Sequence, residues 1–535
     1  MSKNFLSRYS PWIVLTIALY ASAFIYLFIE NFVFSSSLDL MNFREIDDYA
    51  FQLYIRQAHE NRQFFRLNGY AYGWIFWFPI VCITYPFYFL SIYFGIDTPL
   101  AVIPRQLSLF FTMGTAVILY RIASLYTKDN FIKSLILLLY LSFPVTGYFA
   151  LRFGTVSQTM FLSALSYYLT ARKEFLTQKD LYIIAVAVAA AAATKLSALL
   201  ITPLITLVIL DRLSWKIKEN FVPLIKSFFV FLFSLAALSQ IPPKAVIAQI
   251  KMTQTNFGQD FGVFRVFLYG IVFPNLHIII FLVTFLCLVY KAIIALRDDR
   301  NFYKRDYLYI FLALIISIVY LVLTIKMGTM YISIYFTVIS FLLPLGVLAF
   351  EHINIYLRHV IGVVFLATSI FLNFDLIFSS NLNNRPWNTY SVKAADPATI
   401  RDLSIREVLK AKLKNPDEYK DKLKILRDCQ VPSPYSSLRR NVIETCVFGN
   451  IDVVSGKQEY DLIGLYKKDI AFITDSEFND LIKKVDSKIA LQYKNHRKAV
   501  NDFLLKKQFN NVNYQLLLEN EDYLYYVSNS LELNK

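Results

Sequence analysis

Two adjacent carboxylates, Asp47 and Asp48, stand in a charged stretch, "FREIDDYAFQLYIRQAHENRQ", that directly follows the first long apolar run of the chain. A carboxylate at a membrane surface can take a proton from a hydroxyl or an amine, and partial desolvation or an acidic neighbour raises its pKa toward the range of a general base. The pair also fits a structural role, in which one aspartate caps an interfacial helix and the other complements its dipole. The pair alone leaves both interpretations open.

Three basic residues stand in or beside apolar segments: Arg105 in "IPRQLSL", Arg152 in "LRFG" and Lys195 in "AAAATKLSALLITP". Charges at membrane depth are expensive and usually face a polar cavity. Arginine offers a planar fork for phosphate oxygens, whereas lysine offers a point charge. We therefore predict that the three cations bind a phosphate group, although Arg105 and Arg152 lie near the ends of apolar runs and could instead reach lipid headgroups.

The composition of the chain indicates a polytopic membrane protein. Of its 535 residues, 56% are hydrophobic and 17% aromatic, and the mean hydropathy is +0.46, which is too apolar for a soluble protein of this size. The net charge of +15 comes from basic residues in short loops between apolar runs. The positive-inside rule produces this pattern, so it argues against nucleic-acid binding.

The apolar runs predict an all-α membrane domain over residues 1–380, with about 11–13 transmembrane helices. The first run, from about residue 11 to 34, has no cleavage site and is expected to stay as a helix. The run at 181–211 is longer than one crossing needs, so we expect two short helices that meet at Lys195. The remaining runs lie at roughly 73–96, 100–121, 132–150, 155–171, 221–240, 266–291, 307–326, 331–350 and 359–379.

Loop charges predict the orientation. Basic residues at the N-terminus and in the loops 212–218 and 297–305 mark the cytoplasmic side. The loops 35–72 and 241–265, and everything after about residue 380, are then extracytoplasmic. Two further basic loops, 121–133 and 172–179, also look cytoplasmic, but a simple alternating count of helices would place them outside. Two changes reconcile the count with the charges: the 181–211 run divides, and the 73–98 segment, with Pro79 and Pro86, forms a broken hairpin.

Residues 381–535 differ in composition and predict a soluble extracytoplasmic α+β domain. The segment "DIAFITDSEFNDLIKKV" is typical of a strand that leads into a helix, and "NVNYQLLLENEDYLYYVSNS" predicts a terminal β-hairpin. Cys429 and Cys446 lie in this domain and either form a disulfide or remain free thiols. Cys82 and Cys287 lie in apolar runs, where we expect buried small side chains.

Several of these segments, in their order and spacing, resemble the glycosyltransferase C superfamily, and most closely its protein O-mannosyltransferase and aminoarabinose-transferase branch. "IDDYAFQLYIRQA" is similar to that family's first outer loop, with Asp47 in the catalytic position and Asp48 beside it. "NGYAYGWIFWFP" loosely resembles the entry into the next helix. The arginine of "IPRQLSL", the R-x-G of "LRFGTVSQTMFLSALSYYL" and the lysine of "AAAATKLSALLITP" follow in the expected order. The likeness covers residues 10–210 by motif and the rest by architecture.

The resemblance implies an inverting glycosyltransferase in the plasma (inner) membrane that uses a polyprenyl-phosphate sugar on the extracytoplasmic face. Asp47 would be the general base, Asp48 would orient the acceptor or a cation, and the three basic residues would hold the donor phosphate. The acceptor would be a lipid, a glycan or a protein. A flippase or transporter of lipid-linked glycans and an outer-face polysaccharide polymerase or ligase are the alternatives. The chain lacks the internal repeats that a transporter usually shows.

Two departures from the family pattern concern metal binding and the subfamily. Ser157, followed by Gln158, stands where the family usually has an aspartate that helps to hold a divalent metal, so metal dependence is in doubt. Tyr72, Gly73 and Trp74 replace the usual Lys-Pro-Pro of the entry motif. His59 follows on the loop helix, where we expect a solvated side chain, and the 241–265 loop is a candidate lid over the site.

Overall fold

The computed structural model describes part of the chain, and the contacts divide it into two compact units. The described residues are 11–36, 54–62 in part, 73–94, 98–142, 154–240, 285–294, 302–326, 342–367 in part, 423–431 in part, 443–447, 459–484 and 487–534 in part, with single positions between them. One unit spans residues 1–32, 57–85 and 102–391, and the other spans 33–56, 86–101 and 392–535. The predicted boundary near residue 380 lies outside the described residues and stays a prediction.

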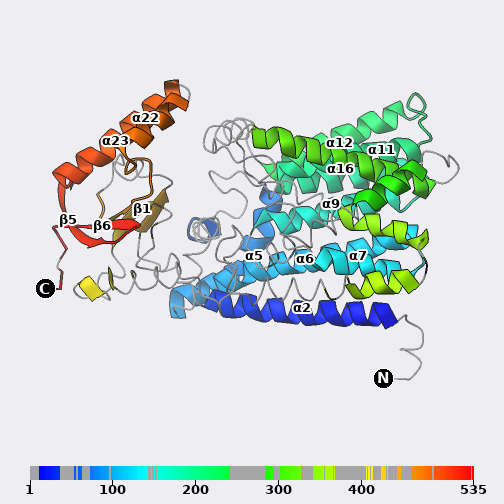
Figure 1. Ribbon diagram of the computed structural model, residues 1–535, viewed down its shortest axis with the longest axis horizontal. Coiled ribbons are helices and arrows are strands. Elements are labelled where there is room, and N and C mark those ends of the chain that lie inside the picture. Colours follow the sequence, from blue (N-terminus) through cyan, green and yellow to red (C-terminus); the bar gives the residue numbers. More distant parts are fainter. Residues whose placement is uncertain are drawn as a thin grey trace. The chain divides into compact units, whose positions relative to one another are not determined.

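The first unit is helical, and its long helices run alongside one another (Figure 1). Its elements follow the predicted apolar runs closely. They are α2 (Pro11–Ser36), α5 (Trp74–Phe94), α6 (Thr98–Tyr126), α7 (Asn130–Ser142), α9 (Thr155–Ala171), α10 (Gln178–Thr194), the 3₁₀ segment η1 (Leu196–Ile201), α11 (Thr202–Arg212), α12 (Phe221–Ser239), α16 (Phe302–Lys326) and the 3₁₀ segment η2 (Leu343–His352). A core of buried Leu, Ile, Ala and Tyr side chains from α6, α7, α9, α11 and α16 holds them together.

The outward surface of this unit is apolar. Two of the described helices, Val102–Tyr126 and Phe221–Ser239, are long and apolar enough to cross a membrane. On α12 the exposed side chains include Phe228, Phe229 and Phe233, which are 57%, 63% and 77% exposed. A continuous apolar face of this kind is stable only against lipid or a partner. The predicted count of 11–13 crossings stays a prediction.

The predicted division of the 181–211 run is confirmed. α10 ends at Thr194, Lys195 adopts an extended backbone, and the chain continues through η1 into α11. Arg212, at the end of α11, donates from Nε to the carbonyl of Lys173 just before α10 at 3.1 Å. The end of α11 therefore lies beside the loop that precedes α10, so the chain reverses direction at Lys195. This turn lies about 25 Å along α10 from the first residue of the helix.

The predicted broken hairpin at 73–98 is wrong, because α5 is one continuous helix over Trp74–Phe94 despite Pro79 and Pro86. Proline lacks the N–H that would bond the carbonyl four residues earlier. At Pro79 that carbonyl belongs to Ile75, and it accepts a hydrogen bond from Gln158 Nε2 on α9 at 3.2 Å. A neighbouring side chain thus replaces the missing bond and allows the helix to continue.

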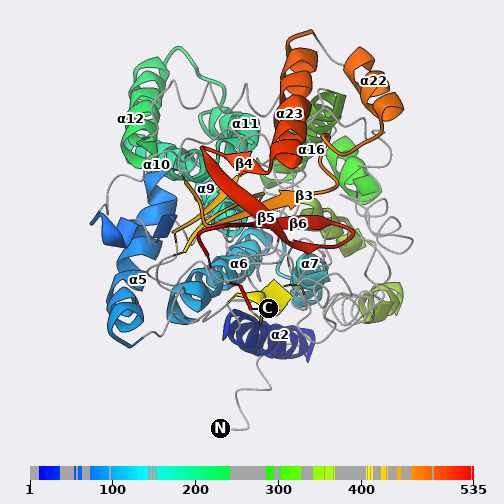
Figure 2. The same cartoon turned by 90° about the vertical axis from the view of Figure 1, so that its left-hand side faces the viewer.

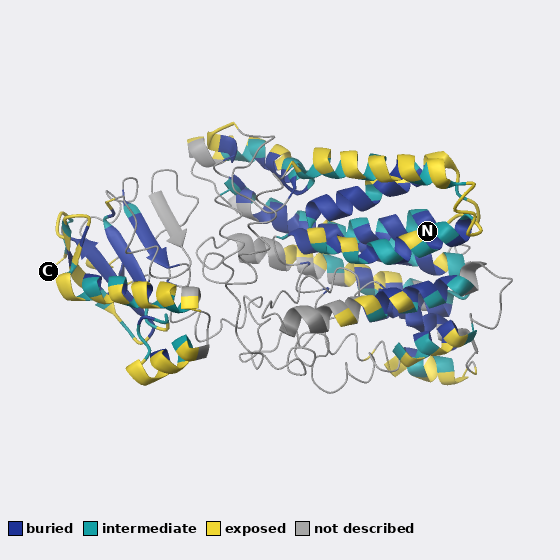
Figure 3. Cartoon of the chain, turned by 90° about the horizontal axis from the view of Figure 1, so that it is seen from above, coloured by how far each residue is buried: buried dark blue, intermediate teal, exposed yellow. Residues whose placement is uncertain are grey.

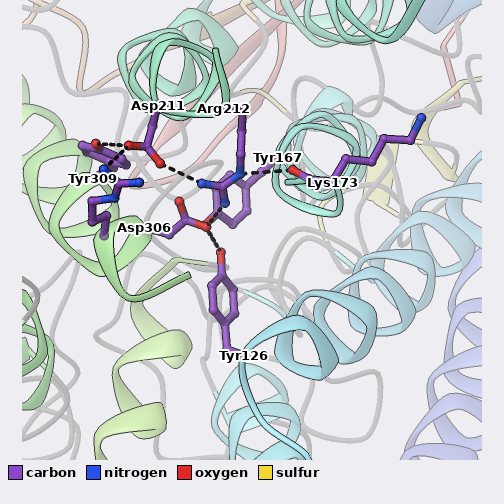
Figure 4. A network of polar contacts seen from close by, with 8 residues as sticks. Tyr126, Tyr167, Lys173, Asp211, Arg212, Asp306 and Tyr309 are labelled. Atoms are coloured by element: carbon purple, nitrogen blue, oxygen red, sulfur yellow. Dashed lines mark hydrogen bonds and ion pairs between the residues drawn. The ribbon is translucent and has the colours of Figure 1, made fainter. Parts of the chain in front are cut away.

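A buried ionic cluster joins four helix ends, as Figure 4 shows. Arg212 Nη1 contacts Asp211 at 2.9 Å and its Nη2 contacts Asp306 Oδ2, on α16, at 2.6 Å. The Tyr126 hydroxyl, at the end of α6, donates to the same Asp306 oxygen at 3.0 Å and lies 2.6 Å from the Tyr167 hydroxyl of α9.

Both carboxylates of this Arg212 cluster have further partners. Asp211 Oδ1 accepts from the Tyr309 hydroxyl at 3.2 Å and pairs with Arg305 at 3.2 Å. The side chains of Asp211, Arg212 and Asp306 are fully buried. The cluster therefore brings the ends of α6, α9 and α11 and the start of α16 together at one end of the unit. These are the helix ends next to the predicted basic loops; which side of the membrane this end faces stays a prediction.

The second unit contains a six-stranded mixed sheet, so the α+β expectation holds for its described part. The strand order is β2 (Ile443–Val447), β1 (Lys424–Asp428), β3 (Leu462–Tyr466), β6 (Tyr523–Ser528), β5 (Val512–Glu519), β4 (Gln508–Phe509). β1 pairs in parallel with β2 and β3, and the remaining pairs are antiparallel. The predicted terminal hairpin is confirmed as β5 and β6.

The sheet has an apolar core on each face. One contains Phe503 of α23 (Ser487–Lys506) against Tyr514 and Tyr526, and the other contains Leu409 and Leu413 against Tyr525. Figure 2 shows α22 (Asp475–Lys484) and α23 beside the sheet, and Figure 3 shows its strands as mostly buried.

The predicted strand at "DIAFI" is wrong, because those residues form turns before α22. Asp469 Oδ1 accepts from the Ala471 amide at 2.9 Å and contacts His496. This side-chain bond to the backbone favours a turn over a strand.

The cysteine expectations have mixed outcomes. Cys82 is exposed and Cys287 is half-buried, and both are free thiols. The expectation of a buried side chain is therefore wrong for Cys82, which lies on an exposed face of α5. Cys429 lies outside the described residues, as does the side chain of Cys446, so their disulfide stays a prediction.

Candidate functional site

The helix-entry motif and the lysine-centred run meet at the end of the first unit opposite the Arg212 cluster. The Gly73 amide donates to the Ala193 carbonyl at 2.9 Å, two residues before Lys195. A Cβ on residue 73 would lie 2.2 Å from that oxygen and 2.9 Å from the Cα of Ser239. Only glycine permits this approach, so the end of the first predicted outer loop is fixed beside the turn at Lys195.

The R-x-G segment joins the same region through two further hydrogen bonds. Gln158, in the first turn of α9, donates to the Ile75 carbonyl of α5. Ser157 is 1% exposed, and its hydroxyl lies 3.1 Å from that of Thr112 on α6. Four helices that carry the sequence motifs (α5, α6, α9 and α10) therefore converge at one end.

Arg105 lies on α6 and is 1% exposed. It precedes Thr112 by seven residues, so the two share one face of the helix about 10 Å apart along its axis. The Arg105 guanidinium thus belongs to the face of α6 that meets Ser157. A fully buried arginine does not match the alternative in which the charged group reaches water or lipid headgroups.

Lys195 ends α10 and begins η1. Its backbone is extended, its amide donates to Ala191 at 3.1 Å, and its side chain is half-buried. The lysine therefore stands at a helix break and not within a continuous span. Unwound backbone at membrane depth is tolerated where it lines a cavity or is buried in protein.

The first turn of α9 offers a further anion-binding feature. Its N-cap, Gly154, makes no side-chain capping bond, and a Cβ at that position would meet nothing within 4 Å. A helix N-terminus favours negative charge through its unsatisfied N–H groups and its dipole. Arg152 precedes this turn by two residues but, like Asp47 and Asp48, lies outside the described residues. The candidate lid 241–265 also lies outside them.

Ser157 stands where the resemblance implies a metal ligand. Where the resemblance places an acidic ligand, the structure has a buried hydroxyl that is bonded to Thr112. Among the described residues, no group of three or more His, Cys, Asp or Glu side chains could hold a metal ion. The residues present at this position do not fit a carboxylate-held metal, and we assign no step to one.

The expectation of a solvated His59 is wrong. The imidazole is 2% exposed, its Nε2 lies 3.0 Å from the Thr84 hydroxyl of α5, and its ring faces that of Tyr85 at 5.5 Å. Ile55 and Ala58 on the same segment are also buried. The loop segment therefore packs on α5, and its described helical residues, 54–55 and 58–60, match the helix expected in this loop. Periodicity did not show that the histidine lies on the buried face.

Burial lowers the pKa of His59 to about 4, and this predicts a pH dependence. In the unfolded chain this histidine has an ordinary pKa near 6.5, so on acidification the unfolded state binds a proton before the folded state does. The free energy of unfolding is therefore unaffected by His59 above about pH 6.5 and falls as the pH drops from 6.5 toward 4. We expect His59→Gln to flatten this part of a plot of thermal midpoint against pH. His359 is exposed, so His359→Gln is the matched control; equal slopes for all three proteins would contradict the assignment.

Gly73 allows a second test. We expect Gly73→Ala to lower the thermal midpoint and the activity together, since the new methyl group must push apart α5 and the end of α10 at a 2.2 Å contact. Gly154→Ala is the control, because open space surrounds that position. Its cost should be limited to about 1 kcal/mol, because alanine is a poorer N-cap than glycine. Equal effects of the two substitutions would show that the Gly73 contact does not matter.

The fold consists of a helical unit and a C-terminal unit with a six-stranded mixed sheet. Two solved structures share it, ArnT from Cupriavidus metallidurans in the apo state and the same protein bound to undecaprenyl phosphate. Each match covers 96% of this chain and 97% of that chain, with a TM-score of 0.53 and 11% sequence identity. The likeness confirms the expected resemblance at the level of the fold. No family model and no curated protein sequence matches the chain.

Proposed function

We propose that this protein is an integral-membrane inverting glycosyltransferase that moves a sugar from a polyprenyl-phosphate donor to an acceptor on the extracytoplasmic face. The observation that carries the proposal is the near full-length ArnT fold, including a structure bound to undecaprenyl phosphate. The convergence of the entry motif, the R-x-G segment and the lysine-centred run at one end of the helical unit supports it independently.

The reaction is a single displacement at the anomeric carbon. An acceptor hydroxyl or amine forms the new bond while the bond from the anomeric carbon to the phosphate oxygen breaks, and the polyprenyl phosphate leaves with the electron pair. The acceptor proton passes to the Asp47 carboxylate, which acts as general base, and Asp48 orients the acceptor. Attack from the face opposite the leaving group inverts the sugar.

Cations stabilise the negative charge on the leaving phosphate. Arg105 and Arg152 supply planar forks, Lys195 supplies a compact charge at the helix break, and the start of α9 supplies backbone N–H groups. Because Arg105 is buried, its charge acts with little screening by water. A low-dielectric setting strengthens such interactions.

The alternative functions make different predictions. A flippase or transporter of lipid-linked glycans would move the donor without consuming it, and a polysaccharide polymerase or ligase would extend a glycan already carried on a lipid. The deciding experiment incubates purified protein in lipid nanodiscs with a polyprenyl-phosphate sugar and an acceptor extract, and measures release of free polyprenyl phosphate. Transfer without loss of the sugar–phosphate bond, or movement across a vesicle membrane alone, would contradict the proposal.

Lys195→Ala is expected to raise the KM for the lipid donor about tenfold or more, because a charge-assisted bond to the phosphate is lost. Titration of the donor at fixed acceptor measures this. Lys179→Ala removes an exposed lysine at the other end of α10 and should leave the KM unchanged. An unchanged KM in Lys195→Ala would remove this residue from the phosphate site without affecting the assignment of Asp47.

A further inference from the structure

An apolar groove of about 620 Å³ lies between α2, α6 and α7, within the size range of small-molecule sites. Its walls include Tyr20 and Phe24 of α2, Phe110 and Val117 of α6, and Leu137 of α7. The polar surface of these walls is small, and Val117 and Phe110 are 60% and 55% exposed. The groove therefore opens sideways onto the lipid-facing surface of the helical unit.

The groove has the length of one lipid leaflet. Its α6 wall runs from Phe110 to Tyr120, which is about 15 Å of helix at 1.5 Å per residue, and half of a typical hydrocarbon core is also about 15 Å. It ends near the helix termini that the Arg212 cluster gathers, since Tyr120 lies six residues before the end of α6 at Tyr126. An acyl chain that enters at this end would fill it.

The same end carries positive charge. Lys133 is 9% exposed and its Nζ lies 5.5 Å from the centroid of the Tyr120 ring, which lines the groove. Among the described residues, Lys133 forms no salt bridge; the carboxylate of Asp129, whose charge also acts on Lys133, pairs with Arg358 at 2.7 Å. Arg121 follows Tyr120 in the chain, Lys128 lies five residues before Lys133, and both are exposed. An anion at this end would meet three basic side chains.

We propose that this groove binds an anionic glycerophospholipid, with one acyl chain between α2 and α6 and the headgroup phosphate at Lys133, Arg121 and Lys128. The charge pattern places this lipid in the cytoplasmic leaflet, away from the site where Asp47 and Lys195 act. The proposal therefore stands or falls separately from the glycosyltransferase assignment. A bound lipid of this kind would fasten α2 to the rest of the helical unit.

Native mass spectrometry of the full-length protein, released from detergent after incubation with phosphatidylglycerol or phosphatidylcholine, tests the proposal. We expect one phosphatidylglycerol adduct on the wild type and weak phosphatidylcholine binding. Lys133→Gln should weaken phosphatidylglycerol binding about fivefold, the contribution of one basic residue near an anionic lipid surface. Lys216→Gln removes an exposed lysine elsewhere and should bind as the wild type does.

A second variant tests the groove itself. Ala21 lines it, and Ala21→Trp should fill the space and abolish the adduct, whereas Ala237→Trp on the exposed surface of α12 should not. Three outcomes would overturn the proposal: equal binding of the two phospholipids, an adduct that survives Ala21→Trp, or a dimer peak lost in Ala21→Trp, which would assign the groove to a second copy of the chain. The thermal midpoint of each variant in detergent without added lipid reports whether it folds.

Discussion

Asp47→Asn should abolish sugar transfer and leave the protein folded in the membrane. The amide is nearly the same size as the carboxylate but cannot accept the acceptor proton, and loss of a general base typically slows a reaction by about 10²- to 10⁴-fold. The rate of polyprenyl phosphate release by purified protein measures this loss. Because the substitution removes the proton acceptor and not the donor site, the KM for the lipid donor should change little.

Two further variants make this result specific. Asp48→Asn should slow transfer less than Asp47→Asn, since its role is to orient the acceptor. Asp480→Asn, on the exposed surface of α22, should have the activity of the wild type. Full activity of Asp47→Asn with a polyprenyl-phosphate sugar would falsify the assignment of the base, and a folding defect in the same variant would favour the capping role of the aspartate.

Arg212→Ala should destabilise the helical unit by about 3–5 kcal/mol, the usual cost of removing one partner from a buried ion pair. Its guanidinium contacts Asp211 and Asp306 at once, so the substitution leaves two buried carboxylates short of positive charge. Arg305 is already engaged with the other carboxylate, Asp211, at 3.2 Å. Thermal unfolding in detergent, followed by loss of helical signal, measures the change.

The controls separate charge burial from loss of side-chain volume. Arg172→Ala removes an exposed arginine near the same end and should cost little. Arg212→Lys should recover part of the loss, because a lysine keeps the charge but not the fork that spans both aspartates. Replacing Asp211, Arg212 and Asp306 together by apolar residues should be milder than Arg212→Ala, since no fully buried charge is left unpaired; Arg305 loses Asp211, but its side chain is 27% exposed and can reach water. A mild effect of Arg212→Ala would mean that water or another cation reaches the cluster.

Local sequence was enough to predict the helix break at Lys195. A 31-residue apolar run is too long for one crossing, and a lysine in its middle is costly unless the chain turns there. The bounds of α9 and α12 also followed from the apolar runs within a residue. The periodicity and length of an apolar run depend only on neighbouring residues, so both can be determined from a single sequence.

Features that depend on distant partners were not predictable in the same way. Pro79 and Pro86 indicated a break in α5, and the missing bond at Pro79 is replaced by Gln158, which donates to Ile75 from 83 residues away. His59 looked solvated because its neighbours in sequence are polar, but Thr84 and Tyr85 enclose it. Ser157 was singled out only as a missing aspartate, and its bond to Thr112 appears only once α6 and α9 are placed side by side.

The Arg212 cluster sets an order of events during synthesis. Asp306 follows Arg212 by 94 residues, so the ribosome delivers it about 5 to 20 s later at ordinary elongation rates. During that interval the α10–α11 hairpin lacks the Asp306 carboxylate that connects it to α16. Tyr126 and Tyr167 are synthesised earlier than Arg212, so they lack this carboxylate for longer. The closed end of the bundle is therefore a late product of biogenesis, and a truncated chain that stops before residue 306 should be exposed to membrane quality-control proteases.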